Sequence, residues 1–399
     1  MMAWSEKLAE LTHEQAAQLS SLGLVDVLAE PASSAWRLRS NSRIGVASGP
    51  GWELRVSPKL SVPKLFFLLA YAQDPNGWKD ELADFDVNDD LVDAIASGFS
   101  WHALRAIEQG LLRDYVRLEE RLIGIRGRIR FADQIARSGG LPFPVEVAYD
   151  DYIEDIIENR IIKSATLALL RMPRIAARAR RRLLKLKAIL DEVTPLSRPR
   201  EVEVPRLTRL NQRYGPALRL GVLILRAASI DAPRGRLAAT AFVFDMNKVF
   251  EDFVSIALRE SIARLGGELK LQWRGRLDQA GAIRIVPDLT WWVGGSCRAV
   301  ADAKYKALEL SSMPNADAYQ MFAYCTALSL ERGFLIYAKD AGEKPATHHI
   351  RNAAAVIEVR TLDVEVEPEL LLRQVDVLAD EIASGYLLGA ARANVVALA

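Results

Sequence analysis

The stretch from Ile283 to Cys325 constrains this chain more than any other. It opens with an apolar run containing Pro287-Asp288, reverses at Gly294-Gly295, and continues through a second apolar run that ends in Asp302-Ala303-Lys304. Two apolar runs joined by a Gly-Gly pair predict a β-hairpin. The hairpin would bring two carboxylates and one ammonium group to the same end. Such a group is suited to binding a divalent metal ion and cutting a phosphodiester.

Composition excludes several other classes of protein. Cys297 and Cys325 are the only cysteines, too few for a disulfide framework or a Cys-rich zinc site. The net charge of +1 says nothing about partners, so only the distribution of charge is informative. The chain shows neither a secretory leader nor a run of about 18 apolar residues. We therefore expect a soluble, cytoplasmic protein with no membrane contact.

The first part of the chain, residues 1–120, is predicted to be an α+β region. Its expected elements are one or two amphipathic helices, a hairpin, a buried helix and a long helix that contains His102. The amphipathic helices are expected within Trp4–Leu28, and the hairpin on both sides of Gly49-Pro50-Gly51. The buried helix is expected at Val62–Ala72 with Pro63 in its first turn, and the long helix from about Leu91 to Glu120.

The second part, residues 121–235, is notably basic. A strand from Ile123 to Phe131 would project Arg126, Arg128 and Arg130 from one side. A helix is predicted to begin at Asp150 or Asp151, with an acidic first turn that suits the helix dipole. Arg174–Leu190 is predicted to be a helix dense in cations: Arg178, Arg180, Arg181, Arg182, Lys185 and Lys187. Both basic segments are compatible with a solvated face and with a contact to nucleic acid or a partner protein.

The third part, residues 236–399, reads as a compact mixed α/β domain in the order α-β-β-β-α-β. The predicted elements are a helix capped by Asp245 or Asn247, three strands that include the hairpin, a second helix and a buried strand. They lie at Phe244–Leu265, Glu268–Arg274, Ile283–Trp292, Cys297–Tyr305, Asn315–Leu330 and Gly333–Ala338. A further strand region, His348–Arg360, and a closing helix, Glu367–Ser384, follow.

The chemistry depends on which faces of the hairpin carry the charges. Asp302 and Lys304 share one face of their strand, and Asp288 meets Asp302 if the register places them opposite each other. Two carboxylates this close repel unless a cation lies between them, and Mg²⁺ prefers such oxygen ligands. The carbonyl of Ala303 could supply another ligand. Lys304 could orient the attacking water and offset charge on the phosphate. An ordinary surface hairpin with an Asp–Lys pair is the alternative.

Three helical residues are further candidates. Glu251, on the helix before the hairpin, could reach the metal; otherwise it is a solvated residue. Gln320 and Tyr324 are four residues apart and so lie on one face of the helix after the hairpin. They could orient a phosphate or the water, or they could simply fill core and surface.

At these residues the sequence resembles the PD-(D/E)xK nuclease superfamily and, more closely, the McrC family of nuclease subunits of McrBC modification-dependent (type IV) restriction systems. The matching stretches are VFEDF, IVPDL, VADAKYK and DAYQMFAYC, with VSPKLSVPKLFFLLAYA, IRGRIRF and DIIENRIIK upstream. The resemblance implies a restriction-endonuclease-like domain with Asp288, Asp302 and Lys304 as the catalytic triad and Glu251, Gln320 and Tyr324 in support.

The resemblance also implies a partner. Subunits of this family leave DNA selection to McrB, an AAA+ GTPase that recognises modified cytosine, and their amino-terminal region docks on the McrB ring and stimulates its GTPase. The present chain contains no G-x-x-x-x-G-K-[ST] phosphate loop, which agrees with a separate motor. The expected function is a Mg²⁺-dependent endonuclease for methylcytosine-containing double-stranded DNA. The alternatives are a non-catalytic scaffold of an AAA+ ring and a stand-alone repair nuclease.

Overall fold

A computed structural model describes residues 6–31, 33–58, 60–75, 90–138, 143–231, 239–305, 315–338 and 345–396. The chain forms two compact units, one made of Met1–Leu91 with Ser229–Ala399 and the other of Val92–Ala228. Helices and several sheets occur together, which confirms the predicted mixed α/β class. The three-part division at residues 120/121 and 235/236 stays a prediction.

The amino-terminal part of the first unit is built from two small sheets. The strand orders are β1-β3-β2 and β5-β4-β10-β9, and Leu19 and Leu22 of α1 pack with Ala47 and Ala241 of the second sheet. The elements are β1 (Glu6–Ala9), α1 (His13–Leu22), β2 (Val25–Ala29), β3 (Trp36–Ser40), β4 (Arg43–Gly49), β5 (Trp52–Val56), β9 (Ala228–Asp231) and β10 (Ala239–Asp245).

Two predictions for this part have different outcomes. The hairpin split by Gly49-Pro50-Gly51 is confirmed as β4 and β5, paired antiparallel. Of the one or two helices predicted within Trp4–Leu28, one is confirmed as α1; the residues on either side of it are wrong as helix, because they form strands β1 and β2. Thr12 caps that helix in a capping box with Gln15, and Gly23 ends it in the left-handed conformation. The helix is therefore limited to the ten residues between the N-cap Thr12 and Gly23.

Helix α2 (Val62–Gln73) links this part to the carboxy-terminal part of the same unit. Pro63 lies in its first turn, as predicted. The rings of Phe67 and Tyr71 each lie 5.6 Å from the ring of Phe253, on helix α9 (Met246–Ala263). The apolar face of α2 is therefore buried against the helix that precedes the hairpin.

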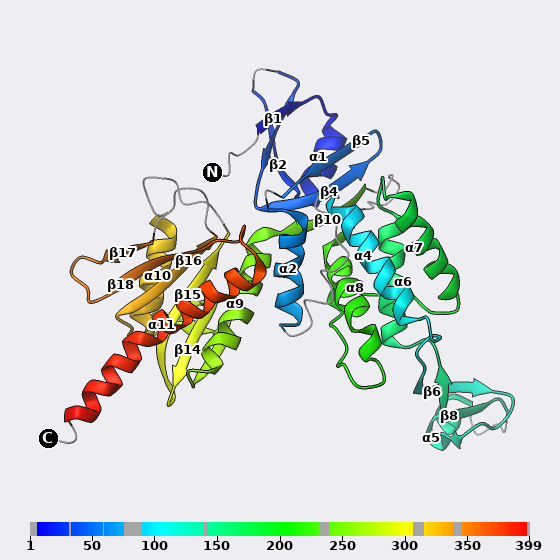
Figure 1. Ribbon diagram of the computed structural model, residues 1–399. Helices are drawn as coiled ribbons and strands as arrows, with labels where there is room; N and C mark the ends of the chain where they lie inside the picture. The colour runs from blue at the N-terminus through cyan, green and yellow to red at the C-terminus, as the bar shows by residue number, and fades with distance from the viewer. Residues whose placement is uncertain are drawn as a thin grey trace. The chain divides into compact units, whose positions relative to one another are not determined.

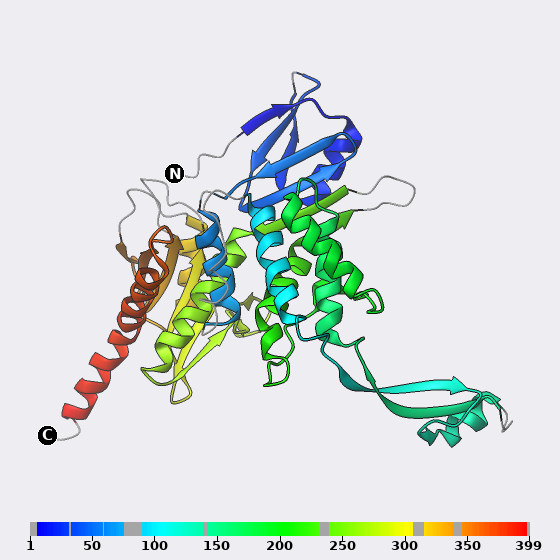
Figure 2. The same cartoon turned by 45° about the vertical axis from the view of Figure 1, so that its right-hand side comes forward.

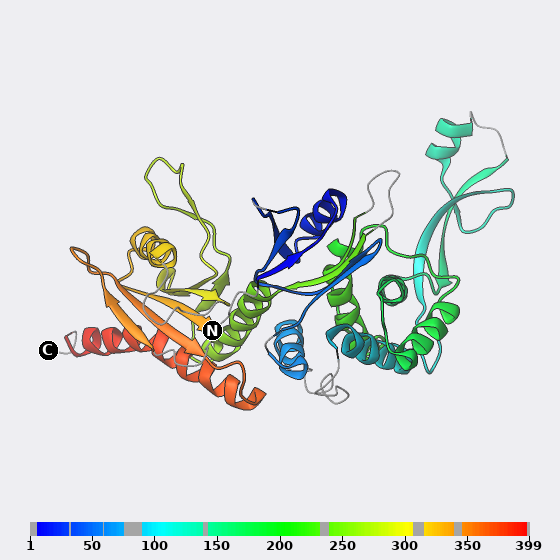
Figure 3. The same ribbon diagram turned by 90° about the horizontal axis from the view of Figure 1, so that it is seen from above.

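The carboxy-terminal part is a six-stranded mixed sheet covered on both faces. Its order is β11-β14-β15-β16-β18-β17, with the pairs β15–β16 and β16–β18 parallel. Helix α10 covers one face, and α9 and α11 pack together on the other (Figures 1 and 3). The elements are β11 (Glu268–Leu271), β12 (Gly275–Arg276), β13 (Arg284–Ile285), β14 (Leu289–Val293), β15 (Ser296–Lys304), α10 (Asn315–Leu328), β16 (Arg332–Ala338), β17 (Ala346–His349), β18 (Val356–Leu362) and α11 (Pro368–Val396).

The main elements of this sheet follow one another as α9-β11-β14-β15-α10-β16, with a small β12–β13 pair inserted. Asp245 caps α9 by accepting the N–H of Asn247 at 3.0 Å, one of the two caps predicted. The α-β-β-β-α-β order expected from the sequence is therefore present.

The second unit is a helical bundle with a projecting β arm. Strands β6 and β8 pair antiparallel over their whole length, and Figure 2 shows the twisted ribbon leaving the bundle with α5 near its far end. The elements are α4 (Leu91–Ala106), β6 (Asp114–Leu122), β7 (Arg128–Ile129), α5 (Phe131–Ser138), β8 (Val145–Ile153), α6 (Ile157–Leu170), α7 (Ala177–Ile189), α8 (Gly215–Ala227) and the 3-10 turns η1 (Pro199–Glu201) and η2 (Gln212–Tyr214).

Three predictions for this unit are wrong. The helix expected from Leu91 to Glu120 ends at Ala106, and Asp114–Leu122 is a strand because it pairs with β8. The strand expected at Ile123–Phe131 is reduced to Arg128–Ile129. The helix expected to begin at Asp150 or Asp151 begins at Ile157, since both aspartates continue β8. All three errors involve the arm, whose pairing joins distant segments. The basic helix within Arg174–Leu190 is confirmed as α7.

Among the described residues, no helix combines the length and apolar character needed to span a membrane. His102 is buried in α4 with its ring 4.7 Å from that of Trp101, so it fills the helical bundle.

Candidate active site

The hairpin of β14 and β15 places Asp288 and Asp302 side by side. Gly294 and Gly295 both have positive φ, 59° and 80°, which the tight turn requires and glycine adopts without strain. Leu289 pairs with Ala301, so Asp288, one residue earlier, lies across from Asp302. The Oδ2 atom of Asp288 accepts the backbone N–H of Ala303 at 3.1 Å. The register therefore produces the juxtaposition that the sequence left conditional.

Asp302 and Lys304 form an ion pair on one face of β15. Asp302 is only 1% exposed, and the ammonium group of Lys304 contacts its Oδ2 atom. Apart from that ion pair, no described group donates a hydrogen bond to this oxygen. Val300, on the same face, packs with Tyr324 of α10. Asp302 thus presents a buried carboxylate oxygen whose charge is balanced by the Lys304 ammonium group.

Glu251 reaches the hairpin from α9 through a residue that sequence reasoning missed. The side-chain amide nitrogen of Gln272 donates to Oε1 of Glu251 at 2.7 Å and to Oδ1 of Asp288 at 2.9 Å. Lys248 also contacts Glu251, at 3.1 Å. Nothing in the sequence marks Gln272, because it follows β11 as one polar residue among several and its position depends on the fold.

The environment of Asp288 favours the neutral acid unless a cation is present. The pKa of Asp288 is raised to about 7. Burial is the largest cause, followed by the charge of Asp302, a hydrogen bond to Asp302 and the charge of Glu251. The hydrogen bond from the backbone N–H of Ala303 lowers the pKa of Asp288. Three carboxyl groups so arranged cannot all ionise cheaply without positive charge among them.

Lys304 supplies part of that charge. Burial lowers its pKa, but the charge and hydrogen bond of Asp302, with the charges of Asp288 and Asp317, outweigh burial and leave the pKa raised. Lys304 is therefore a cation at neutral pH. Asp317 is a second residue missed by the sequence analysis: it is buried on α10 and accepts a hydrogen bond from Tyr337 at 2.6 Å.

Gln320 and Tyr324 lie beside the hairpin as a linked pair. The amide nitrogen of Gln320 donates to the Tyr324 hydroxyl at 2.7 Å, and that hydroxyl donates to the carbonyl of Val286 at 3.2 Å. Burial, and then the charge of Asp302, raises the pKa of Tyr324 to about 12. The pair therefore anchors α10 to the segment just before Asp288.

The carboxylates do not form a preformed cage. Within the described part of the chain, no group of three or more His, Cys, Asp or Glu side chains is arranged to hold a metal ion. Gln272 lies between Glu251 and Asp288, and Lys304 is paired with Asp302. Metal ligation by Asp288, Asp302, Glu251 and the Ala303 carbonyl stays a prediction.

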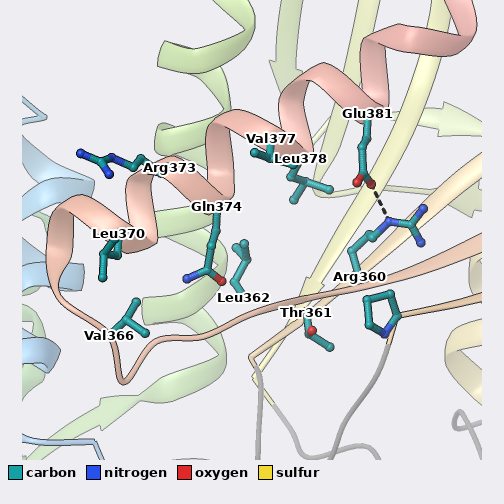
Figure 4. A pocket seen from close by; sticks show the side chains of 11 residues that line it. Arg360, Thr361, Leu362, Val366, Leu370, Arg373, Gln374, Val377, Leu378 and Glu381 are labelled. Carbon is teal, nitrogen blue, oxygen red and sulfur yellow. Dashed lines mark hydrogen bonds and ion pairs between the residues drawn. The ribbon is translucent and has the colours of Figure 1, made fainter.

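A cavity of about 520 Å³ lies elsewhere in the same part, between β18 and α11 (Figure 4). Arg360 in its wall is held by Glu381 at 2.6 Å. None of the predicted site residues lines it. The lining residues are Pro345, Arg360, Thr361, Leu362, Val366, Leu370, Arg373, Gln374, Val377, Leu378 and Glu381.

The two basic segments of the second unit have different surroundings. In the arm, Arg126 pairs with Asp151 at 2.8 Å, and Arg130 pairs with Glu119 at 2.9 Å and with Asp133 at 2.6 Å. The prediction that Arg126, Arg128 and Arg130 project together from one strand is wrong, because only Arg128 belongs to β7. The cations of α7 form no ion pair within the described residues.

Comparison with known proteins agrees with this picture. The family model of the McrBC 5-methylcytosine restriction system component matches residues 38–338. No curated protein matches. A chain from the tetradecameric assembly of Thermococcus gammatolerans McrB AAA+ hexamers with bound McrC shares the fold, with a TM-score of 0.57 and 17% identity, covering 95% of this chain and 98% of that one.

A chain of the Thermococcus gammatolerans McrBC complex is also similar, with a TM-score of 0.38 and 20% identity over 65% of this chain and 86% of that one. The match of the family model spans more than half of the sequence. The chain therefore belongs to the McrBC 5-methylcytosine restriction system component family.

Proposed function

We propose that this chain is the DNA-cutting subunit of a modification-dependent restriction system. It would be a Mg²⁺-dependent endonuclease with a PD-(D/E)xK αβββαβ domain, acting on methylcytosine-containing double-stranded DNA when an McrB-like AAA+ GTPase hexamer activates it. The observation that carries the proposal is the buried Asp302 paired with Lys304 and lying across from Asp288. The family membership supports the same assignment.

The donor set fits Mg²⁺. Asp288, Asp302 and Glu251 offer carboxylate oxygens, which a hard divalent ion prefers, and Oδ2 of Asp302 is buried with the Lys304 ammonium group as its ion-pair partner. A bound Mg²⁺ would polarise the scissile phosphate and lower the pKa of a coordinated water.

The chain's own residues have separate roles in this proposal. Lys304 keeps its proton and can hydrogen-bond a non-bridging phosphate oxygen, where it offsets the charge that builds up in the transition state. Tyr324 and Gln320 position the segment that carries Asp288, because the Tyr324 hydroxyl donates to the Val286 carbonyl. We assign these two a positioning role.

The arm of the second unit is the proposed docking surface for the ring. Large apolar side chains that are at least half exposed gather on it, and such clusters mark protein interfaces. They are Tyr115, Ile123, Ile125, Phe131, Ile135, Phe143 and Tyr152. The similar solved chain comes from an assembly of McrB AAA+ hexamers with bound McrC. Docking there would couple the partner's GTPase, which we propose the chain stimulates, to cleavage.

Cleavage of plasmids with and without methylcytosine tests the proposal. Wild-type and Asp302→Asn chains are compared in Mg²⁺, with and without the partner, and with GTP or ATP. We expect Asp302→Asn to lower cleavage by on the order of 10³-fold or more while the partner's GTPase stimulation persists. Asp252→Asn, an exposed carboxylate on α9 paired with Lys248, is the matched control and should cut normally.

Two outcomes would contradict the proposal. Cleavage that survives Asp302→Asn would remove this site as the catalytic centre. A wild-type chain that stimulates the GTPase but never cuts would favour the scaffold function, and cutting that needs no partner would favour a stand-alone nuclease.

A further inference from the structure

Within the part of the chain that the structure describes, the cationic face of α7 has no counterions. Arg178, Arg180, Arg181, Lys185 and Lys187 are exposed, and Arg182 is half-buried. Within the described residues none of these six forms an ion pair. Elsewhere in the same unit several arginines are paired with acids, for example Arg113 with Glu154 at 2.6 Å. The contrast shows that α7 concentrates charge that the surrounding unit leaves uncompensated.

This arrangement costs stability in the isolated chain. Arg178, Arg181, Arg182 and Lys185 are spaced i, i+3, i+4 and i+7, so they repel one another along one stripe. The first turn contains arginine and no acid, which opposes the helix dipole. Asp93 accepts the N–H of Ala176 at 2.6 Å at this end but pairs with none of the six cations.

The helix is nevertheless held firmly. Ala179, Leu183 and Leu186 are fully buried, and α7 packs along α6. The cations are therefore presented on a rigid rod rather than on a flexible tail. A rod of 13 residues extends about 20 Å, a length over which duplex DNA offers several phosphates.

We propose that the exposed face of α7 binds the phosphate backbone of duplex DNA, an inference that rests on the proposed nuclease function. Phosphates would relieve the repulsion along the stripe and the unfavourable dipole interaction together. Phosphate contact carries no sequence information, so this surface would hold DNA of any sequence and leave recognition of the modified base to the partner.

Salt-titrated binding of the full-length chain to a short unmodified duplex tests this surface. The triple variant Arg178→Ala, Arg181→Ala, Lys185→Ala should lower affinity at least about tenfold and reduce the slope of log K against log salt by about 2 to 3. The matched control, Arg113→Ala, Arg126→Ala, Arg160→Ala, removes the same charge from residues that are paired with acids.

Three results would overturn the inference: an unchanged slope in the α7 variant, an equal loss in the control, or a loss of partner binding with DNA binding intact. The last would assign the face to the protein partner. Each leaves the proposed function standing if the wild type still cuts DNA in the presence of its partner.

A second, independent observation concerns Gln272. Its φ of 49° lies in the left-handed region, which non-glycine residues seldom adopt. Its backbone N–H donates to the carbonyl of Asp288 at 2.9 Å, and its one side-chain nitrogen donates to both Glu251 and Asp288. Gln272 thus combines a left-handed backbone with a side-chain amide that donates one hydrogen bond to each of two carboxylates.

We infer that the Gln272 amide holds the place of a cation between Glu251 and Asp288, which again rests on the proposed function. If Glu251 and Asp288 held a metal ion, their carboxylates would have to give up both hydrogen bonds from Gln272, so Gln272 would compete with the ion. A residue that merely oriented the ligands would have the opposite effect on metal affinity, since removing it would weaken binding.

Calorimetric titration of the full-length chain with Mg²⁺, without DNA, separates the two roles. Gln272→Gly keeps the backbone conformation without strain, and Gln272→Asn keeps an amide that is too short to reach both acids. We expect Gln272→Asn to bind Mg²⁺ about tenfold more tightly than wild type, the effect of losing one charge-assisted hydrogen bond, and Gln272→Gly, which loses both, to bind it more tightly still. Gln374→Ala, remote from the carboxylates, is the control.

Unchanged or weaker binding in both Gln272 variants would overturn the inference. Asp288→Asn distinguishes this result from failure of the proposed site, because it should weaken Mg²⁺ binding whatever Gln272 does. If Asp288→Asn also leaves binding unchanged, the metal site itself is wrong.

Discussion

The candidate active site and helix α7 differ in whether their charged side chains are buried and paired or exposed and unpaired within the described residues. In the site, Asp302 is buried and paired with Lys304, and Glu251 and Asp288 share the amide of Gln272. On α7, cations lie exposed beside other cations. Burial in the first case couples each ionisation to its neighbours and shifts the pKa of Asp288 upward, whereas exposure in the second leaves the charges able to act on charged partners at a distance.

The two regions should therefore respond to different variables. The paired, buried charges of the site are poorly screened by salt and sensitive to pH and to single substitutions. The exposed charges of α7 are screened by salt and act as a sum, so single substitutions there should have small effects. The following predictions test this difference, beginning with the largest effect.

Removing the ammonium group from the site should have the greatest effect. Lys304→Met leaves Asp302 buried without its partner, so we expect cleavage to fall about 10²- to 10³-fold. The free energy of unfolding should fall by about 3 kcal/mol, the cost of an uncompensated buried charge. Cleavage assays with the partner and denaturant unfolding measure the two effects. Lys270→Met, a half-exposed cation on β11, is the control and should change neither quantity appreciably.

Asp288 should make stability depend on pH in the metal-free chain. Its folded pKa of about 7 lies above the unfolded value, so the folded state binds the proton more tightly. Stability should therefore fall as pH rises from about 4 to about 7 and level off above that. Thermal unfolding across this range measures the slope, and Asp288→Asn should flatten it. Identical slopes in the two proteins would show that Asp288 does not titrate as described.

Tyr324→Phe tests the positioning role with a smaller effect. The substitution keeps the buried ring and removes the hydroxyl that links Gln320 to Val286. We expect unfolding to become easier by about 1 kcal/mol and cleavage to fall about tenfold. A loss of stability with full cleavage would reduce Tyr324 to a packing residue.

The smallest effect is expected in the arm. Arg126 pairs with Asp151 and lies over the ring of Tyr149 at 4.0 Å, but the pair is exposed. A double-mutant cycle with Arg126→Ala and Asp151→Ala should give a coupling that is small compared with the effect of Lys304→Met and that falls with added salt. If the coupling energy of Arg126 with Asp151 were as large as that of Lys304 with Asp302, exposed and buried ion pairs in this chain would not differ as proposed.

Sequence-based prediction succeeded where the determining interactions are local. The Gly294-Gly295 turn and the alternation on either side place the hairpin, and Asp245 marks the start of α9. Prediction failed in the arm, where Asp114–Leu122 reads as helix because its apolar spacing is ambiguous. Its partner strand, Val145–Ile153, begins more than 20 residues later in the chain, and such pairing cannot be seen in a short window.

The amino-acid sequence by itself determined the catalytic candidates and the existence of a basic helix, because both depend on residue type and on spacing within one element. Only the tertiary structure decided that Asp288 lies across from Asp302 and that Gln272 bridges Glu251 and Asp288. It also decided that Arg126 and Arg130 of the arm are paired with acids, while the cations of α7 form no ion pair within the described residues. Charges become paired or left alone through contacts between distant segments, and those contacts form only when the chain folds.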